Sequence, residues 1–270
     1  RWPRPSIIWR SFGANTRCLP LIKADVVVIG GGAAGIYAAI HAAKQGSRVL
    51  LLERNDRLGK KLLITGKGRC NVTNNCTAAE VLQNVPRNGR FLYSAMEAHD
   101  PQSVYAFFET AGCPLKTERG NRVFPTSDKS QSILDALKRQ LQQYKVTVET
   151  GRCQQILCDE NGVCGVRTQQ KTIPCKWVIL ATGGLSYPST GSTGDGYKWA
   201  KDMGHSIKTL FPSLTAIVPK GYKITEVSKG HIDRSTPCSE IGGMLCGNQL
   251  KNVGLSLIVD GNTAEDEFGD

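Results

Sequence analysis

Residues 26–35 read VVVIGGGAAG, and this stretch decides the fold of the chain. Four consecutive apolar residues without alternation predict a strand that is buried on both faces. The three glycines that follow have the G-x-G-x-x-G spacing of a dinucleotide-binding turn. In such a turn Gly30 permits the tight bend, Gly32 lets the backbone approach a pyrophosphate, and Gly35 lets the next helix pack closely on the strand.

The residues after this turn complete the same motif. Residues 36–45 are rich in alanine and predict a helix that ends at Gly46, and residues 49–53 read VLLLE and predict a second buried strand. Glu53 ends that strand, where an acid accepts hydrogen bonds from a ribose. Strand, glycines, helix, strand and acid therefore occur within about thirty residues, as the full motif requires. The alternative is a glycine-rich turn that binds no ligand.

Charge is unevenly distributed along the 270 residues. The net charge is +11, of which residues 1–23 contribute five cations and no acids, which leaves about +6 for the rest. An Arg-rich, acid-free segment with Ser and Thr is typical of an organelle transit peptide. We therefore expect residues 1–23 to be a leader or a disordered tail, and the protein to be organellar, with a plastid slightly favoured over a mitochondrion. No apolar run has the length of a membrane span.

Two further segments combine glycine with polar residues. Residues 60–74 read KKLLITGKGRCNVTN and predict a loop that wraps a phosphate or a polar ring edge, or a plain surface loop. Residues 177–180 predict another buried strand, which leads into ATGGLSYPSTGSTGDGY at 181–197 and a helix to about Met203. This second glycine loop is another backbone-lined place for an anionic ligand. Asp195 either holds a ligand hydroxyl or caps the helix.

The remaining segments predict ordinary core elements. Residues 78–119 predict one or two helices, with Phe91, Tyr93, Tyr105, Phe107 and Phe108 in the core or over a site. Asp128 and Gln131 resemble a capping box, and the apolar residues at 133, 134, 137 and 141 fall on one helical face. Strands are expected at 146–148, 215–218 and 255–259, and a hairpin within 156–166 around Asn161-Gly162.

The cysteines give no sign of a metal or redox centre. None of the ten forms a C-x-x-C pair or a zinc-ligand spacing. Cys153, Cys158, Cys164 and Cys175 are expected to be buried thiols in strands. Cys70 lies in a candidate ligand loop but has no second cysteine at the spacing that disulfide reductases use.

Taken together, the motifs resemble the BaiN/YhiN-type (HI0933-like) flavoproteins, which are FAD/NAD(P)-dependent oxidoreductases. The resemblance covers residues 24–270 and is carried by residues 28–35, 60–74, 122–125, 181–197, 214–219 and 251–253. It implies an α/β chain with a Rossmann-like FAD-binding domain of the two-dinucleotide-binding-fold type and an inserted β-rich domain. On this basis residues 24–211 form the FAD-binding domain, and residues 212–270 begin the inserted domain.

This chain departs from the family pattern in three places. Lys67 stands where the family has glycine, and residues 221–250 are longer than the usual connection. Family members also continue past the 267–270 region, so the resemblance implies that the inserted domain and the returning C-terminal segment are incomplete here.

The resemblance implies tightly bound FAD and a hydride transfer through the flavin to or from an unidentified small-molecule substrate. Only one G-x-G-x-x-G is present, so NAD(P)H would bind transiently as electron donor. The residues expected to bind the cofactor are Gly30, Gly32, Ala33, Ala34, Gly35, Glu53, Arg54, Lys61, Gly68, Arg69, Cys70, Asn71, Ala181, Thr182, Gly183, Gly184, Gly194 and Asp195.

Two other functions are compatible with the sequence. The positive charge favours a nucleic-acid-associated, RNA-modifying flavoprotein, but no aromatic-basic RNA motif is present, so we expect no nucleic acid partner. The other is a non-catalytic, truncated nucleotide-binding protein. The sequence identifies no catalytic residue and no oligomeric state.

Overall fold

The computed structural model describes residues 24–212, 253–259 and 262–269. The chain divides into two compact units, Arg1–Ile207 and Lys208–Asp270. In the second unit, β11 (Val253–Val259) and β12 (Asn262–Gly269) form an antiparallel pair, which confirms the strand predicted at 255–259. The leader predicted at 1–23 and the strand predicted at 215–218 lie outside the described residues. In the described part of the chain, no helix has the length and apolar character needed to cross a membrane.

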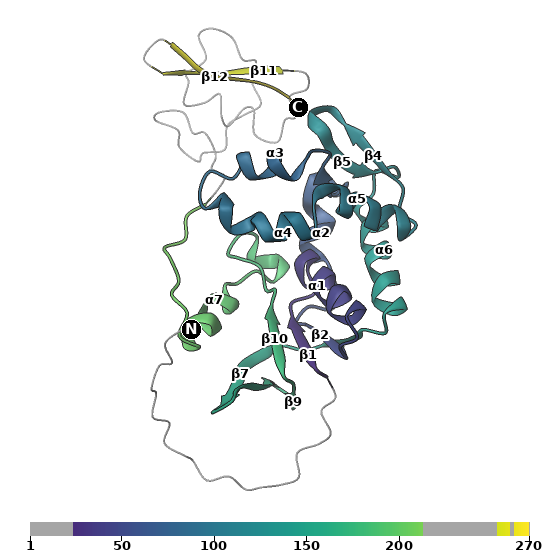
Figure 1. Ribbon diagram of the computed structural model, residues 1–270, viewed down its shortest axis with the longest axis vertical. Helices are drawn as coiled ribbons and strands as arrows, with labels where there is room; N and C mark the ends of the chain where they lie inside the picture. The colour runs from purple at the N-terminus through teal and green to yellow at the C-terminus, as the bar shows by residue number, and fades with distance from the viewer. Residues whose placement is uncertain (1–23, 213–252, 260–261, 270) are drawn as a thin grey trace, which may run out of the picture. The chain divides into compact units, whose positions relative to one another are not determined.

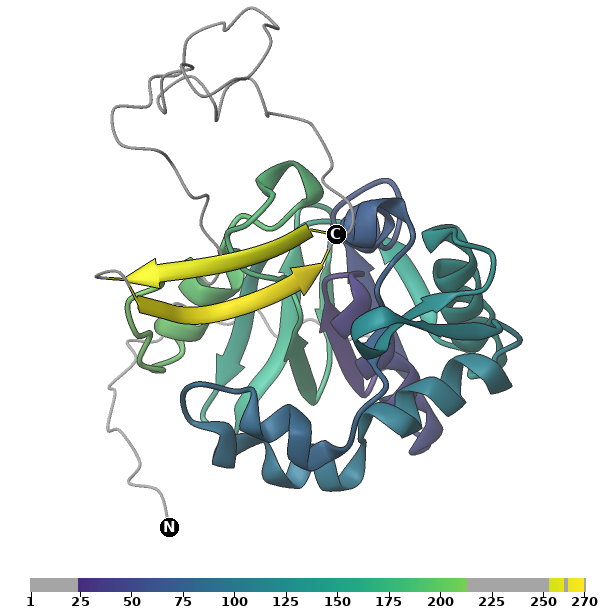
Figure 2. The same ribbon diagram turned by 90° about the horizontal axis from the view of Figure 1, so that it is seen from above.

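The first unit is built on a four-stranded parallel sheet. Its strands, in spatial order, are β10 (Trp177–Leu180), β1 (Val26–Ile29), β2 (Val49–Glu53) and β6 (Thr147–Thr150). Val28 lies opposite Leu51 on one side and Ile179 on the other. The α/β fold class with a Rossmann-type sheet is therefore confirmed (Figures 1 and 2).

Alternate residues of β1 pack into two separate cores. Val26 and Val28 face the helices α1 (Ala33–Lys44), α5 (Pro101–Thr110) and α6 (Ser130–Gln143). Val27 and Ile29 face the antiparallel sheet β7 (Cys153–Asp159), β8 (Gly162–Thr168) and β9 (Thr172–Pro174). Because both faces are covered, the unbroken apolar run of β1 is what a central parallel strand needs. The views in Figures 1 and 2 show α1 and α6 together on one side of the sheet.

The helices α1 and α6 differ from the sequence predictions mainly at their beginnings. The helix α1 begins at Ala33 rather than Ile36, so the glycine turn itself forms its first turn. The apolar face predicted for α6 is confirmed, since its residues at 133, 134, 137 and 141 are buried. The capping box predicted at Asp128 is wrong: the N-cap is Lys129, and Asp128 has a left-handed backbone (φ 55°) and pairs with Lys116 at 2.7 Å.

Residues 78–110 form three helices rather than one or two. The helices α3 (Ala78–Gln83) and α4 (Tyr93–Ala98), joined through a short 3-10 helix (Gly89–Leu92), lie side by side in Figure 1 and bury none of their residues. The core role predicted for the aromatic residues is confirmed for Phe107 and Phe108 of α5. It is wrong for Phe91, which is 87% exposed, and for Tyr93, because the α3–α4 hairpin extends beyond the core.

The strand β10 has the predicted position but not the predicted burial. Trp177 is 69% exposed because β10 is the edge strand of the parallel sheet, where only one neighbour pairs with it. The hairpin predicted around Asn161-Gly162 is confirmed as β7–β8. Of the four cysteines in this region, Cys153 and Cys175 are buried as expected, whereas Cys158 and Cys164 are exposed.

The segment 60–74 is more regular than a loop. It contains α2 (Lys60–Ile64), a 3-10 helix (Thr65–Gly68) and β3 (Thr73–Asn74), which pairs with β5 (Arg122–Pro125) and, through it, β4 (Leu115–Glu118). Lys67 has left-handed dihedral angles (φ 56°, ψ 39°). A residue with a Cβ is disfavoured in this conformation and glycine is not. This is a physical reason why glycine suits position 67 in the family pattern.

Candidate functional site

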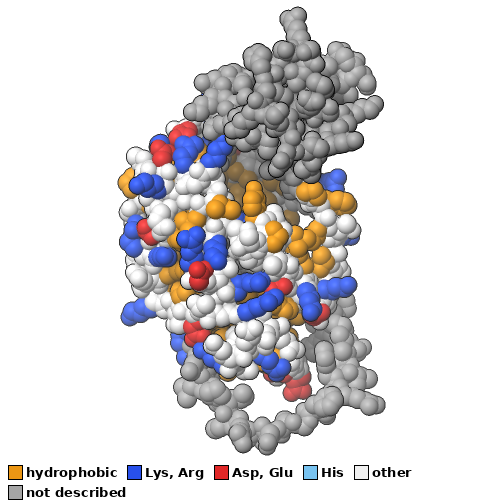
Figure 3. Space-filling view, turned by 180° about the vertical axis from the view of Figure 1, so that it is seen from behind, with side chains coloured by type: hydrophobic (Ala, Val, Ile, Leu, Met, Phe, Trp, Pro, Cys, Tyr) orange, Lys and Arg blue, Asp and Glu red, His pale blue; other side chains and the backbone are white. Residues whose placement is uncertain are grey.

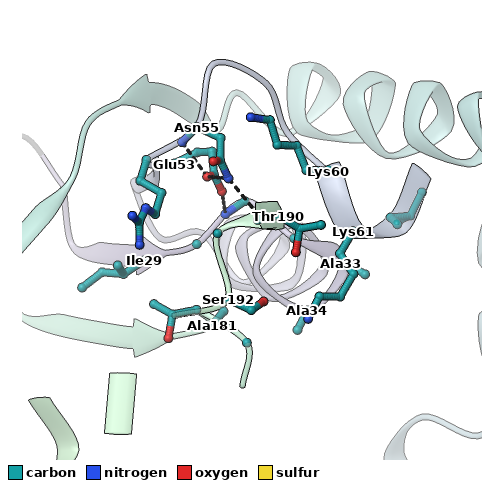
Figure 4. A pocket seen from close by; sticks show the side chains of 18 of the residues that line it. Ile29, Ala33, Ala34, Glu53, Asn55, Lys60, Lys61, Ala181, Thr190 and Ser192 are labelled. Atoms are coloured by element: carbon teal, nitrogen blue, oxygen red, sulfur yellow. Dashed lines mark hydrogen bonds between the residues drawn. The ribbon is translucent and has the colours of Figure 1, made fainter. Parts of the chain in front are cut away.

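A cavity of about 870 Å³ lies at the carboxyl ends of β1, β2 and β10. In open α/β sheets this is where ligands bind. Most of the predicted cofactor residues line it: Gly30, Gly32, Ala33, Ala34, Glu53, Arg54, Lys61, Cys70, Asn71, Ala181, Thr182, Gly183 and Asp195. They come from the two glycine loops and from the segment after β2, which the fold brings together around one space (Figure 4).

The two glycine loops are in direct contact. Gly30 has φ +111°, and a Cβ on it would lie 2.4 Å from the carbonyl oxygen of Ala181. Gly35 does not line the cavity, but a Cβ there would lie 1.8 Å from the carbonyl oxygen of Gly30. Gly35 therefore has the packing role that the motif assigns to its third glycine, and only hydrogen atoms fit at these two positions.

The N-terminus of α1 opens into the cavity. A Cβ on Gly32, the N-cap, would meet no atom within 4 Å. The first intrahelical hydrogen bond runs from Ile36 N–H to Gly32 O at 3.0 Å, and no described side chain caps the preceding amides. Unpaired amides at the positive end of a helix dipole attract an anion. The space at Gly32 lets a phosphate reach the amides of Ala33 and Ala34.

Glu53 is held in place by three hydrogen bonds. Its Oε2 accepts from Gly31 N–H at 2.5 Å, and its Oε1 accepts from Asn55 N–H at 2.8 Å and from Asn55 Nδ2 at 2.7 Å. Its side chain is buried, with the residue 7% exposed. A carboxylate has about four acceptor positions, so one on Oε2 is left for a ligand hydroxyl. Glu53 thus fixes the glycine turn as well as facing the cavity.

Asn55 connects the two halves of the site, and the sequence prediction missed it. Besides binding Glu53, its Nδ2 donates to the carbonyl oxygen of Thr190 at 3.2 Å (Figure 4). A Cβ on Gly191 would lie 2.7 Å from the same Nδ2 atom, so the second loop packs directly against this amide. The only indication in the sequence was that Asn55 has a short amide side chain and lies two residues after Glu53, the acid that ends the strand.

We expect Asn55→Ala to loosen the second glycine loop. The substitution removes a hydrogen bond to a buried carboxylate and the bond to Thr190, worth together about 2 kcal/mol. The melting temperature should fall by roughly 4–8 °C, and residues 181–194 should be cut faster in limited proteolysis. Asn74→Ala is the matched control, since its Nδ2 also donates to a carbonyl, Gly120 O, but lies away from the cavity. Equal effects of the two substitutions would contradict the role of Asn55.

Several cations surround one rim of the cavity. The Asp195 carboxylate pairs with Arg54 and with Arg152, each at 3.3 Å. Asp195 is the first residue of α7 (Asp195–Asp202), whose N-cap is Gly194, so its side chain does not cap that helix. Lys61 donates to the carbonyl oxygen of Ser186 at 2.7 Å, which ties α2 to the second loop. This rim is suited to a ligand with more than one negative charge.

Some predicted residues do not line the cavity: Gly35, Gly68, Arg69, Gly184 and Gly194. The Arg69 guanidinium pairs with Glu118 at 2.9 Å and with Asp128 at 3.3 Å, and lies 4.0 Å from the centre of the Phe124 ring. Its Nη1 atom thus binds protein carboxylates. Cys70 does line the cavity, and burial raises the pKa of its thiol, which favours the neutral form.

The cavity also has an apolar end that the sequence prediction did not include. It is formed by side chains of α1, α2, α5 and α6 that also belong to the core: Tyr37, Leu62, Val104, Phe108, Ile133 and Leu137. The spacing of these apolar residues in the sequence predicts that they are buried. It does not distinguish a side chain that packs against protein from one that packs against a ligand. The cavity therefore joins a cationic rim to an apolar interior.

Comparison with known proteins agrees with this geometry. The family model for the HI0933-like protein Rossmann domain matches residues 24–256. The chain is 34% identical over 204 residues to a 3-dehydro-bile acid delta(4,6)-reductase of Clostridium scindens. The aligned residues cover 74% of this chain and 49% of that protein. It is 30% identical over 196 residues to a ribosomal RNA dihydrouridine synthase of Escherichia coli, and the aligned residues cover 72% of this chain and 47% of that protein. The chain spans about half the length of the curated relatives it matches.

A solved structure shares the fold of about two thirds of this chain. The crystal structure of 3-ketosteroid delta1-dehydrogenase from Sterolibacterium denitrificans in complex with 1,4-androstadiene-3,17-dione matches with a TM-score of 0.53 and 15% identity, over 67% of this chain and 55% of that one. This likeness concerns the fold alone. Because the family model matches residues 24–256, the chain belongs to the HI0933-like family and contains its Rossmann domain.

Proposed function

We propose that this chain is the FAD-binding part of an FAD-dependent oxidoreductase. The observation that carries the proposal is the open N-terminus of α1, where Gly32 leaves space beside unpaired amides and next to the Glu53 carboxylate. An anionic diphosphate and an adjacent ribose need these two groups side by side. The relative named as a 3-dehydro-bile acid delta(4,6)-reductase supports a redox activity.

The residues of the cavity fit FAD in charge and in polarity. The amides of Ala33 and Ala34 would hold the diphosphate, and the free acceptor position of Glu53 would hold a ribose hydroxyl. Arg54 and Lys61 supply positive charge at the rim, and the apolar end suits a planar ring. When bound, the flavin supplies the hydride chemistry, whereas the chain supplies binding, orientation and electrostatics.

We propose a small organic molecule as substrate and NAD(P)H as a transient electron donor. The reductase named among the relatives supports a small-molecule substrate, and the single G-x-G-x-x-G turn supports a donor without a separate dinucleotide fold. The described residues contain no group of three or more His, Cys, Asp and Glu side chains that could hold a metal ion.

Purification and flavin titration test the proposal. We expect the chain to carry a flavin absorbance band, or to regain one when FAD is added to colourless protein. NADH or NADPH added without oxygen should then bleach that band. A folded protein that stays colourless and does not quench FAD fluorescence at saturating concentration would contradict the cofactor assignment. Bound FAD that neither nucleotide reduces would contradict the donor and favour a non-catalytic nucleotide-binding protein.

An RNA-modifying flavoprotein is a weaker proposal. Its support is the net charge of +11. One relative is named as a ribosomal RNA dihydrouridine synthase, but it is less similar than the reductase and does not favour this alternative. On the face seen in Figure 3, Lys and Arg side chains are scattered among uncharged ones rather than gathered in one stripe. A nucleic-acid surface usually has such a stripe. Salt-dependent retention on RNA, measured without residues 1–23, would favour this proposal over the first.

A further inference from the structure

Tyr37 lines the apolar end of the cavity and is hydrogen-bonded to a histidine. Its hydroxyl pairs with Nε2 of His99, which follows α4. The His41 ring lies 4.6 Å from the Tyr37 ring and 5.2 Å from the His99 ring, centre to centre. Neither the glycine loops nor the cofactor residues explain this cluster, which we call the Tyr37 cluster (Tyr37, His41 and His99).

We propose that Tyr37 and His99 form a proton relay between the cavity and solvent. The inference rests on the proposed function, because reduction of a ligand in the cavity creates the base that the relay protonates. The Tyr37 O–H bond breaks as a bond from hydrogen to a basic ligand atom forms. His99 takes a proton at Nδ1 from a solvent acid, hydronium or a buffer acid, as it gives its Nε2 proton to the phenolate, so the ring stays neutral and changes tautomer, and exchange with solvent restores the first tautomer. Neither residue is oxidised or reduced.

The position of each group suits its step. Tyr37 is half-buried, and burial raises the pKa of its phenol to about 12, so it holds its proton until a stronger base forms beside it. His99 is partly exposed and bonds the hydroxyl of the half-buried Tyr37, so the residue lies between that hydroxyl and solvent. When Nε2 carries the proton, it donates to the Tyr37 oxygen and leaves the phenolic hydrogen free for the cavity.

The groups around His41 favour its neutral form. Burial lowers the pKa of His41, and the charges of Lys44 and His99 lower it further. Its Nε2 is buried without a hydrogen-bond partner among the described residues. Lys44 on α1 lies over the Phe107 ring, 5.3 Å from its centre, and Asp100 is next to His99. His41 therefore packs against the relay and does not compete as an acid.

Histidine NMR tests the hydrogen bond without any cofactor. The chain has four histidines, at 41, 99, 205 and 231, so a protein with ¹⁵N-labelled histidine gives few signals. We expect Tyr37→Phe, which keeps the ring packing, to shift the Nε2 signal of His99 and to leave His205 unchanged. If Tyr37→Phe does not fold, the hydrogen bond is tested from its other partner with His99→Gln. We then expect the tyrosine absorbance titration of His99→Gln to differ from that of the wild type. An unchanged His99 signal or titration would overturn the relay.

The proton transfer itself is measured in protein loaded with FAD. The bound flavin is photoreduced, and proton uptake is followed with an indicator dye. We expect uptake to slow by about a hundredfold in Tyr37→Phe and in His99→Gln, with the flavin spectrum retained, as for loss of a general acid. Tyr144→Phe is the control, because Tyr144 packs against the same core and does not line the cavity. A wild-type uptake rate in either relay variant would overturn the proposal.

The two measurements separate the relay from the proposed function. A wild-type chain that binds no FAD contradicts the cofactor assignment, and the relay is then decided by the histidine spectrum alone. A chain that binds FAD but takes up protons normally in Tyr37→Phe keeps the proposed function and loses the relay.

Discussion

Gly35→Ala is expected to lower the melting temperature by roughly 10 °C or to prevent folding. The added Cβ would lie 1.8 Å from the carbonyl oxygen of Gly30, which is backbone and cannot rotate away. The helix α1 would have to shift from β1, and overpacking of this kind costs about 3 kcal/mol or more. For a domain of this size each kcal/mol corresponds to about 2–4 °C.

Thermal unfolding by circular dichroism measures this effect, and Gly32→Ala is the matched control. Both substitutions add one methyl group to the same turn, but a Cβ on Gly32 meets no atom within 4 Å. The control should therefore keep the melting temperature within about 2 °C, as for a substitution that creates no clash. If Gly35→Ala melted like its control, the packing of α1 on β1 would differ from that described here.

Gly32→Val is expected to leave the fold intact and to weaken FAD binding by about a hundredfold. The larger side chain would fill the open space in front of the α1 amides, where the proposed diphosphate binds. Loss of two hydrogen bonds to a charged group, at about 1.5 kcal/mol each, gives about 3 kcal/mol, or roughly a hundredfold.

Fluorescence titration with FAD measures this loss, and melting temperature without FAD provides the control on folding. Gly32→Ala should have an intermediate affinity, because its smaller side chain displaces the phosphate less. Unchanged affinity in Gly32→Val would place the diphosphate elsewhere, and the two glycine loops would then need another ligand.

The sequence predicted those parts of the molecule that depend on local patterns. The unbroken apolar run of β1, the glycine spacing and the acid at Glu53 are properties of one short segment, and the structure places them as predicted. The apolar face of α6 is of the same kind, since helical periodicity alone determines it.

The parts that were missed depend on contacts between distant segments. Asn55 matters because Thr190 lies beside it, and the exposure of Trp177 depends on β10 being an edge strand. Asp128 has the composition of a cap, but Lys116 and Arg69 hold it in another conformation. Arg69 shows the same limit, because a cation near glycines suits a phosphate and an internal ion pair equally well.

The pairing of β1 with β10 also has a consequence for the order of events during synthesis. Val26 pairs with Trp177, roughly 150 residues later in the chain, so the two glycine loops meet only after a long loop has closed. At about 5–20 residues per second, the ribosome delivers β10 on the order of ten seconds after β1. In that interval β1 has β2 beside it and one open edge, which is the kind of surface that pairs with other chains. Protection of this edge by a chaperone would therefore matter more for yield than the final stability of the sheet.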